Sequence, residues 1–159
     1  MSSFRDTVLV LAVTTVGLAA GLFAAFAYAV MPGLRQAGAT SAVAAMQRIN
    51  VAILNPVFAL VFVGALVFGV VATALWWGDG LRWWLVAAVA LYAVALLITA
   101  GLNVPLNNRL DAAGAVTGTQ AVAAWADFIG PWVQWNIVRA VASTAAFVVA
   151  LVGVLQTRG

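Results

Sequence analysis

Of the 159 residues, 66% are hydrophobic and 7% are charged, which is too apolar for a soluble domain, so we expect one membrane domain over residues 1–159. The net charge of +3 comes from seven Arg and four Asp, too few basic residues for the dense basic face that binds nucleic acid. The absence of Cys and His excludes disulfides, iron–sulfur clusters and haem held through either residue, and no metal site or cofactor is expected.

The first apolar run covers residues 8–30. Its length of about 23 residues is enough to cross a hydrocarbon core of about 30 Å. Small residues recur every four positions along it, at Gly17, Gly21, Ala25 and Ala29. Such a row allows close approach of another helix, and we expect it to pack within the bundle.

A short helix is expected in the first loop. Residues 42–54 carry apolar side chains at roughly helical spacing, and Thr40 or Ser41 is a candidate N-cap. The residue before a proline avoids helical geometry, so this interfacial helix should bend at Asn55-Pro56 into the next span.

The second and third apolar runs cover residues 56–75 and 81–102. The connection between them, residues 76–80, is so short that the two helices must be antiparallel neighbours. Tryptophan is enriched where a membrane meets water, so we expect the tryptophans to form two belts at opposite membrane surfaces. One belt contains Trp76, Trp77, Trp83 and Trp84, and the other contains Trp125, Trp132 and Trp135.

The third run ends in the segment Asn103-Val104-Pro105-Leu106-Asn107. Pro105 is expected to end this helix, because it disfavours helical geometry at the residue before it. Two roles for Asn103 and Asn107 stay open. They either cap carbonyl groups freed at the helix end or contact a ligand.

The fourth run covers residues 131–155, with Pro131 as a favourable first helical residue. A short helix over residues 120–129, capped by Thr119 and ended by Gly130-Pro131, is expected before it. The expected fold is therefore all-α: an integral membrane four-helix bundle with short interfacial helices in the first and third loops.

With four membrane crossings, both termini and the short hairpin lie on one side of the membrane, and loops 31–55 and 103–131 lie on the other. Basic residues near the helix ends are divided almost evenly between the two sides. We favour cytoplasmic termini and a bacterial plasma membrane as the location.

Polar and aromatic residues share one face at the start of the fourth run, namely Trp132, Trp135, Asn136, Arg139 and Ser143. Three roles are open for Arg139, which lies about two turns inside the span. It snorkels to the headgroups, forms an ion pair with Asp127 or Asp111, or makes an anion site in an aromatic-walled pocket.

Gln47 and Asn50 in the first loop lie three residues apart and are expected to point together towards the bundle. With them, the candidate ligand-binding residues are Gln47, Asn50, Asn103, Asn107, Trp132, Trp135 and Asn136. The candidate catalytic residues are Arg139 and Asp127.

Four segments together resemble one known family: Val30-Met31-Pro32-Gly33-Leu34, Met46-Gln47-x-Ile49-Asn50, Asn103-Val104-Pro105-Leu106-Asn107 and Trp135-Asn136-x-Val138-Arg139. This order of motifs resembles the anthrone-oxygenase-like family, much of which is described only as a domain of unknown function. The resemblance implies a four-helix membrane protein. It also implies kinship with members that oxidise anthrones to anthraquinones with O₂ and no metal, haem or flavin.

Two functional hypotheses follow. In the first, the protein binds a planar hydrophobic aromatic molecule and oxygenates it without a cofactor. Arg139 with Asn136 or Asn103 would stabilise an enolate-like oxygen, and Asp127 or Asp111, its pKa raised by burial, would be the base.

In the alternative, the protein is a non-catalytic accessory subunit or lipid-binding element of a membrane complex. Arg139 then serves packing or a lipid headgroup. The expected partners are membrane lipids in both cases, with an aromatic small molecule in the first and membrane-complex partners in the second. Transport is less favoured, because no ionisable relay crosses the middle of the spans.

Overall fold

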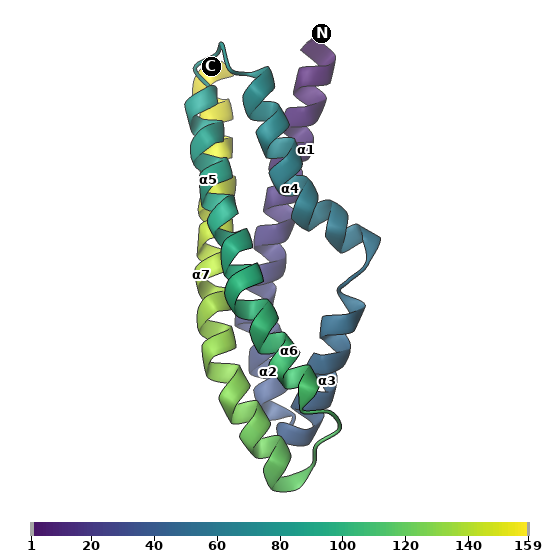
Figure 1. Ribbon diagram of the computed structural model, residues 1–159. Coiled ribbons are helices and arrows are strands. Elements are labelled where there is room, and N and C mark those ends of the chain that lie inside the picture. Colours follow the sequence, from purple (N-terminus) through teal and green to yellow (C-terminus); the bar gives the residue numbers. More distant parts are fainter. Residues whose placement is uncertain (1, 159) are drawn as a thin grey trace.

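The computed structural model describes residues 2–158, and every regular element in that range is a helix. Figure 1 shows long rods side by side, with shorter helices gathered at the end opposite the termini. Within the described residues, four stretches are long and apolar enough to cross a membrane, namely Ser3–Gln36, Pro56–Leu75, Arg82–Ala112 and Gly118–Thr157. The predicted all-α, four-helix membrane fold is confirmed.

The first rod does not end near residue 30. It consists of α1 (Ser2–Ala25), a π-helical turn η1 (Phe26–Val30) and α2 (Met31–Gln36) in direct succession. The third rod is built in the same way from α5 (Arg82–Ile98), a π-helical turn η2 (Thr99–Asn103) and α6 (Val104–Ala112). Each rod therefore carries one widened turn between two α-helical segments.

Pro105 does not stop the third rod, contrary to the sequence-based expectation. It is the second residue of α6, directly after η2, and Pro32 holds the same place after η1. The amide of Val104 donates to the carbonyl of Thr99, five residues back. A proline lacks an N–H and collides with the carbonyl four residues earlier, and the widened turn relieves both conflicts.

The fourth rod is also continuous. α7 runs from Gly118 to Arg158 with Pro131 in its interior, so the expected break at Gly130-Pro131 is wrong and residues 120–129 form the first part of α7. An interior proline costs about 3 kcal/mol. Phe128 and Trp132 flank it, contact each other with ring centroids 5.9 Å apart and share one core. This packing holds both halves of the rod in line.

The chain between the first two spans forms α3 (Ala39–Ala52), and α4 (Pro56–Leu75) follows it. α3 begins after Gly38, whose φ of 78° suits glycine, so neither Thr40 nor Ser41 is its cap. The bend at Asn55-Pro56 is present. The Asn55 side chain caps α4 by accepting a hydrogen bond from the amide of Phe58 at 3.0 Å.

Three of the four rods are longer than a membrane requires. α4 has 20 residues, about 30 Å at 1.5 Å per residue, whereas the other spans have 34, 31 and 40 residues. Their extra length, with α3, forms what we call the cap: α2, α3, α6 and residues 118–132 of α7 (Figure 1). The cap carries the charged residues Arg35, Arg48, Arg109, Asp111 and Asp127.

The cap and Phe26 of η1 form a separate apolar core, whose other members are Met31, Ala42, Val43, Met46, Leu110, Trp125, Phe128 and Trp132. Trp125 and Trp132 are therefore buried packing residues, and the expected interfacial belt on this side is not formed by them. At the other end, Trp77 and Trp83 of the hairpin region are exposed, as an interfacial position requires.

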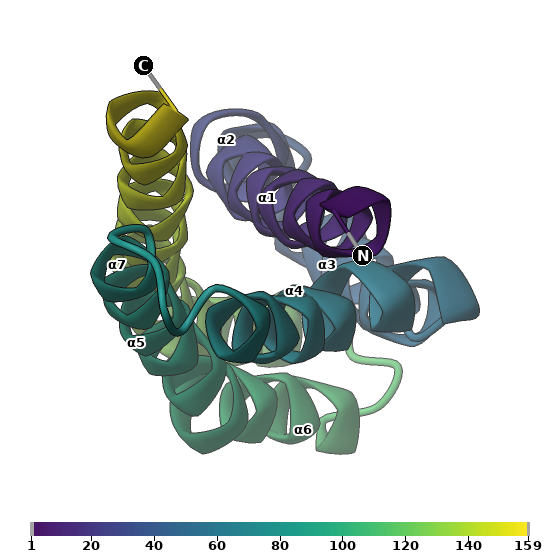
Figure 2. The ribbon, with the colours of Figure 1, turned by 90° about the horizontal axis from the view of Figure 1, so that it is seen from above.

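Below the cap, α1 packs against α4 and α7, and α5 packs against α4 and α7, as the end-on view shows (Figure 2). α5 and α7 approach each other closely at Gly153, where a Cβ would collide with the Cβ of Trp84. Gly17 of α1 similarly lies against the ring of Phe147, whereas Gly21 meets nothing. The row of small residues therefore packs inside the bundle only in part.

Candidate functional site

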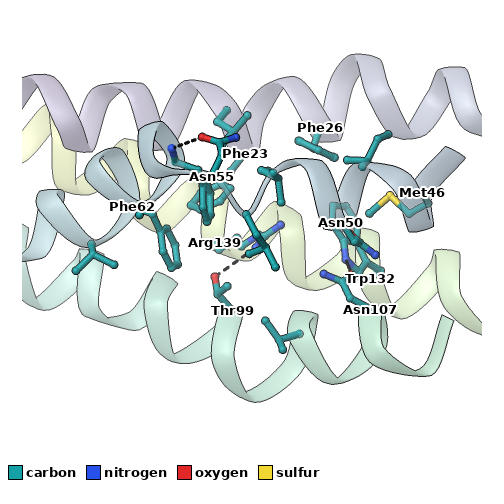
Figure 3. Close-up of a pocket in the computed structure, with 18 of the residues that line it drawn as sticks. Phe23, Phe26, Met46, Asn50, Asn55, Phe62, Thr99, Asn107, Trp132 and Arg139 are labelled. Carbon is teal, nitrogen blue, oxygen red and sulfur yellow. Dashed lines mark hydrogen bonds between the residues drawn. The ribbon is translucent and has the colours of Figure 1, made fainter. Parts of the chain in front are cut away.

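A cavity of about 690 Å³ lies between the cap and the membrane bundle. Its walls come from the end of α1, η1, α3, the start of α4, the region of η2 and α6, and the middle of α7. Figure 3 shows side chains from these elements pointing into one space. The aromatic part of the wall consists of Phe23, Phe26, Phe58, Phe62 and Trp132.

Arg139 lines this pocket and is only 7% exposed. Its Nε donates to Oδ1 of Asn136 at 3.1 Å, and its Nη1 donates to Oγ1 of Thr99 at 3.3 Å. Its Cζ lies 4.3 Å from the ring centroid of Phe23 and 5.2 Å from that of Trp132. A guanidinium offers five N–H donors, and these two are the only ones with hydrogen-bond partners among the described residues.

Both partners of the guanidinium are themselves held in place. Asn136 is fully buried, and its Nδ2 donates to the carbonyl of Phe23 on α1 at 3.0 Å. The hydroxyl of Thr99, the first residue of η2, donates to the carbonyl of Ala95 at 2.8 Å. The charge of Arg139 is therefore fixed by side chains anchored to two other rods, with several N–H groups left for a bound oxygen.

Neither of the two structural roles expected for Arg139 is present. It stays buried instead of reaching the headgroups, and within residues 2–158 it forms no ion pair. Asp127 is exposed and lines a separate hollow with Arg109. Twelve residues on one continuous helix place it roughly 120° around α7 from Arg139. Asp111 is exposed at the end of α6.

A second polar group lies on the cap side of the pocket. Oδ1 of Asn107 accepts a hydrogen bond from the indole Nε1 of Trp132 at 2.7 Å, and both residues line the pocket. Asn50 lines it from α3, and its Nδ2 is buried without a hydrogen-bond partner among the described residues. Figure 3 shows these three side chains near one another, with Arg139 further along the same space.

Asn103 lies just behind the wall and is almost fully buried. Its Nδ2 donates to the backbone carbonyl of Trp132 at 3.2 Å, which ties η2 to α7. Because the rod continues through both asparagines, neither Asn103 nor Asn107 caps a helix end. Asn107 contacts the pocket, and Asn103 positions the helix that carries Trp132.

Two predicted ligand-binding residues lie elsewhere. Nε2 of Gln47 donates to the carbonyls of Leu110 and Gly114 at 2.9 and 3.0 Å, so it caps the end of α6 and does not point with Asn50. Trp135 is 37% exposed and is not part of the pocket wall. On the wheel of α7 it lies roughly 60° from Trp132 and roughly 100° from Asn136 but only about 40° from Arg139, so it lies at the outer edge of their shared face.

Thr99 and the aromatic wall formed by Phe23, Phe58 and Phe62 were not predicted from the sequence. A signal for Thr99 was available, since it is a lone polar residue in an apolar run and lies four residues before Asn103 on the same helix face. The sequence carries no signal for the phenylalanines, because phenylalanine in an apolar run is as typical of a packed core as of a pocket wall.

The chemistry available in the pocket follows from its polar residues, which are Asn50, Asn55, Thr99, Asn107, Asn108 and Arg139. They provide amide, hydroxyl and guanidinium groups and no carboxylate. Such a set can orient a molecule through hydrogen bonds and stabilise negative charge on it. It holds no side chain that takes a proton near neutral pH.

Comparison with known proteins gave one family. The family model described as anthrone oxygenase matches residues 49–149, a range that includes Asn50, Thr99, Asn107 and Arg139. Neither the curated proteins nor the solved structures gave a match.

Proposed function

The chain belongs to the anthrone oxygenase family, and we propose that its pocket binds a planar, hydrophobic anthrone-like or quinol-like molecule and oxygenates it with O₂ without a cofactor. The observation that carries this proposal is the buried guanidinium of Arg139, which lies beside the rings of Phe23 and Trp132 with N–H groups available. This arrangement suits an oxygen atom that gains negative charge on an aromatic framework.

The reaction balances with the substrate and O₂ alone. Loss of a proton from the methylene of an anthrone gives an enolate, whose ring carbon passes electrons to O₂ and forms a C–O bond. The resulting hydroperoxide loses water as its C–H and O–O bonds break, which leaves a second carbonyl. The sum is R₂CH₂ + O₂ → R₂C=O + H₂O.

Arg139 supports the first step by stabilising the enolate oxygen. A cation beside that oxygen lowers the pKa of the bound substrate, because it favours the charged form. The described residues of the pocket wall include no carboxylate, and Asp127 lies in a different hollow. We therefore propose that water, and not a protein side chain, accepts the proton that the substrate loses.

The size and walls of the pocket support a ligand with fused rings. Pockets for small organic molecules typically measure about 300–1,000 Å³, and this one measures about 690 Å³. Flat aromatic molecules stack on side chains such as Phe62 and Trp132, which lie on different rods and line the same space. Asn50 and Asn107 add hydrogen-bonding groups on the cap side.

The test is oxygen uptake by purified protein in lipid nanodiscs with 1,8-dihydroxyanthrone as substrate and a chelator present. Spontaneous oxidation is measured in empty nanodiscs and subtracted. One O₂ should be consumed for each anthraquinone formed. Arg139→Met should lose a factor of about 10²–10³ in kcat, the scale for removing one group that stabilises a developing oxyanion.

The matched control is Arg48→Met, which removes an exposed arginine of α3 outside the pocket. This variant should keep the rate of the unmodified protein. A folded protein that turns over no member of a panel of anthrones and quinols, or an Arg139→Met variant at full rate, would overturn the proposal.

A further inference from the structure

Some residues line the pocket and are also exposed at the surface, so they mark its mouth. The large apolar ones are Leu54, 76% exposed, Val63, 53%, and Val104, 40%. Leu54 and Val63 belong to the α3–α4 connection and the first half of α4, and Val104 begins α6. Figure 1 shows the first turns of α4 diverging from the rod of α5 and α6. The mouth lies on this side of the bundle, between two rods.

The mouth lies at the depth of the lipid. Val63 is seven residues inside α4, about 10 Å from Pro56 at 1.5 Å per residue, and Pro56 opens a span of only 20 residues. Val104 is the first residue of α6, where the cap meets the membrane-spanning part of the third rod. The opening therefore begins where the hydrocarbon core begins and continues into it.

The mouth carries no charge. Among residues 2–158, Arg139 is the only charged one in the pocket wall, and it is buried. The amide of Asn55, at the rim, is already used, since its Oδ1 accepts from Phe58 and its Nδ2 donates to the carbonyl of Ala52. A neutral apolar molecule dissolved in lipid crosses such an opening without losing hydration, whereas an ionised molecule from water does not.

We infer that the pocket is loaded sideways from the membrane leaflet next to the cap, and that its substrates are uncharged aromatic molecules that partition into the bilayer. This inference rests on the proposed function for the identity of the ligand. It adds the route and the physical class of the substrate. Arg139 then meets the substrate only at the inner end of the path, where deprotonation creates the charge that the guanidinium stabilises.

The first test measures the association rate constant of 9,10-anthraquinone, which is not oxidised further, with the protein in nanodiscs. Val63→Trp and Val104→Trp place a large side chain at the mouth and should each slow association by a factor of about ten or more. Val67→Trp is the matched control, an exposed valine on the same helix outside the pocket, and its rate should not change.

The second test replaces the probe and not the protein. Anthraquinone-2-sulfonate has the same ring system and a fixed negative charge, so entry through lipid predicts association slower by a factor of about ten or more. Equal rates for the two probes, or unchanged rates in both mouth variants, would overturn sideways entry. These readouts need no turnover. Binding without O₂ consumption would contradict the oxygenase and leave the entry route standing, whereas a protein that binds neither probe would contradict both.

Discussion

The Nε of Arg139 donates to Oδ1 of Asn136 at 3.1 Å, and both side chains are buried on one face of α7. The other end of the same amide donates to the carbonyl of Phe23, so one side chain joins the guanidinium to α1. An amide can do this because it offers an acceptor and a donor on opposite sides. Asn136 thereby sets the position of the charge that the proposed reaction uses.

Replacing this amide by an apolar side chain of similar size should destabilise the protein. In Asn136→Leu, the Nε of Arg139 and the carbonyl of Phe23 both lose their partner, at a cost of about 1–3 kcal/mol for a buried group left unpaired. Thermal unfolding in detergent measures the effect. Gln134→Leu makes the same kind of change at an exposed position of α7 and should be nearly neutral. Equal melting temperatures for the two variants would contradict the bridging role.

The shape of the guanidinium should matter as well as its charge. Arg139→Lys keeps a positive charge but cannot donate to both Asn136 and Thr99 in the geometry of a planar fork. We expect kcat to fall by about tenfold or more, with Arg139→Met lower still. Oxygen uptake with 1,8-dihydroxyanthrone compares the three proteins. A lysine variant as fast as the unmodified protein would reduce the role of Arg139 to charge alone.

The membrane spans were predictable because length and hydropathy are properties of whole segments. The short connection at 76–80 also fixed the antiparallel hairpin. The continuity of the rods was not predictable, because the rule that a helix ends near a proline is local. Pro105 is accommodated by the π-helical turn η2, which packs against α7, and the proline alone does not indicate whether a helix ends or widens.

The candidate site was predictable where residues share one helix face. Trp132, Asn136 and Arg139 were found from their spacing, and all three are buried at or beside the pocket. Asp127 was a candidate base because the sequence contains no His, Lys, Glu or Cys, and the expected helix break at Pro131 left its direction relative to Arg139 open. Once α7 is continuous, the twelve-residue spacing alone separates Asp127 from Arg139 by roughly 120°.

This separation predicts that Asp127 is not the base. Asp127→Asn should keep the rate of oxygen uptake, because the carboxylate lines a hollow apart from the pocket. The pH dependence of kcat/KM should then follow the ionisation of the substrate and shift when a more acidic anthrone is used. If this variant folds but loses activity, Asp127 takes part in the reaction, and the proposed transfer of the proton to water is wrong.

Two glycines should respond to the same substitution with opposite signs. Alanine is favoured over glycine inside a helix by about 0.5–1 kcal/mol, so Gly21→Ala, where a Cβ meets nothing, should raise the melting temperature. In Gly153→Ala the Cβ would collide with the Cβ of Trp84. The backbones of α5 and α7 must then move apart, a cost of about 1–3 kcal/mol. Thermal unfolding of both variants decides the point, and a stabilised Gly153→Ala would contradict the close contact.

Asn50 allows a test in which ligand binding and stability change in opposite directions. Its Nδ2 is buried at the pocket without a partner among the described residues. A buried donor left unpaired costs about 1–3 kcal/mol, and a ligand oxygen would recover that cost. In Asn50→Leu the ligand-free protein should therefore be at least as stable as the unmodified protein.

The same variant should bind 9,10-anthraquinone about tenfold more weakly, since one hydrogen bond of about 1 kcal/mol or more is lost. Anthracene has the same three rings and no acceptor oxygen, so its affinity should be the same for both proteins. Titration of each ligand against both proteins gives the four affinities needed, and the two melting temperatures are measured without ligand. If both ligands weaken equally, Asn50 only shapes the wall. If neither weakens, the donor does not face the ligand. If only the affinity for 9,10-anthraquinone falls, the unpaired amide of Asn50 donates to an oxygen of the ligand.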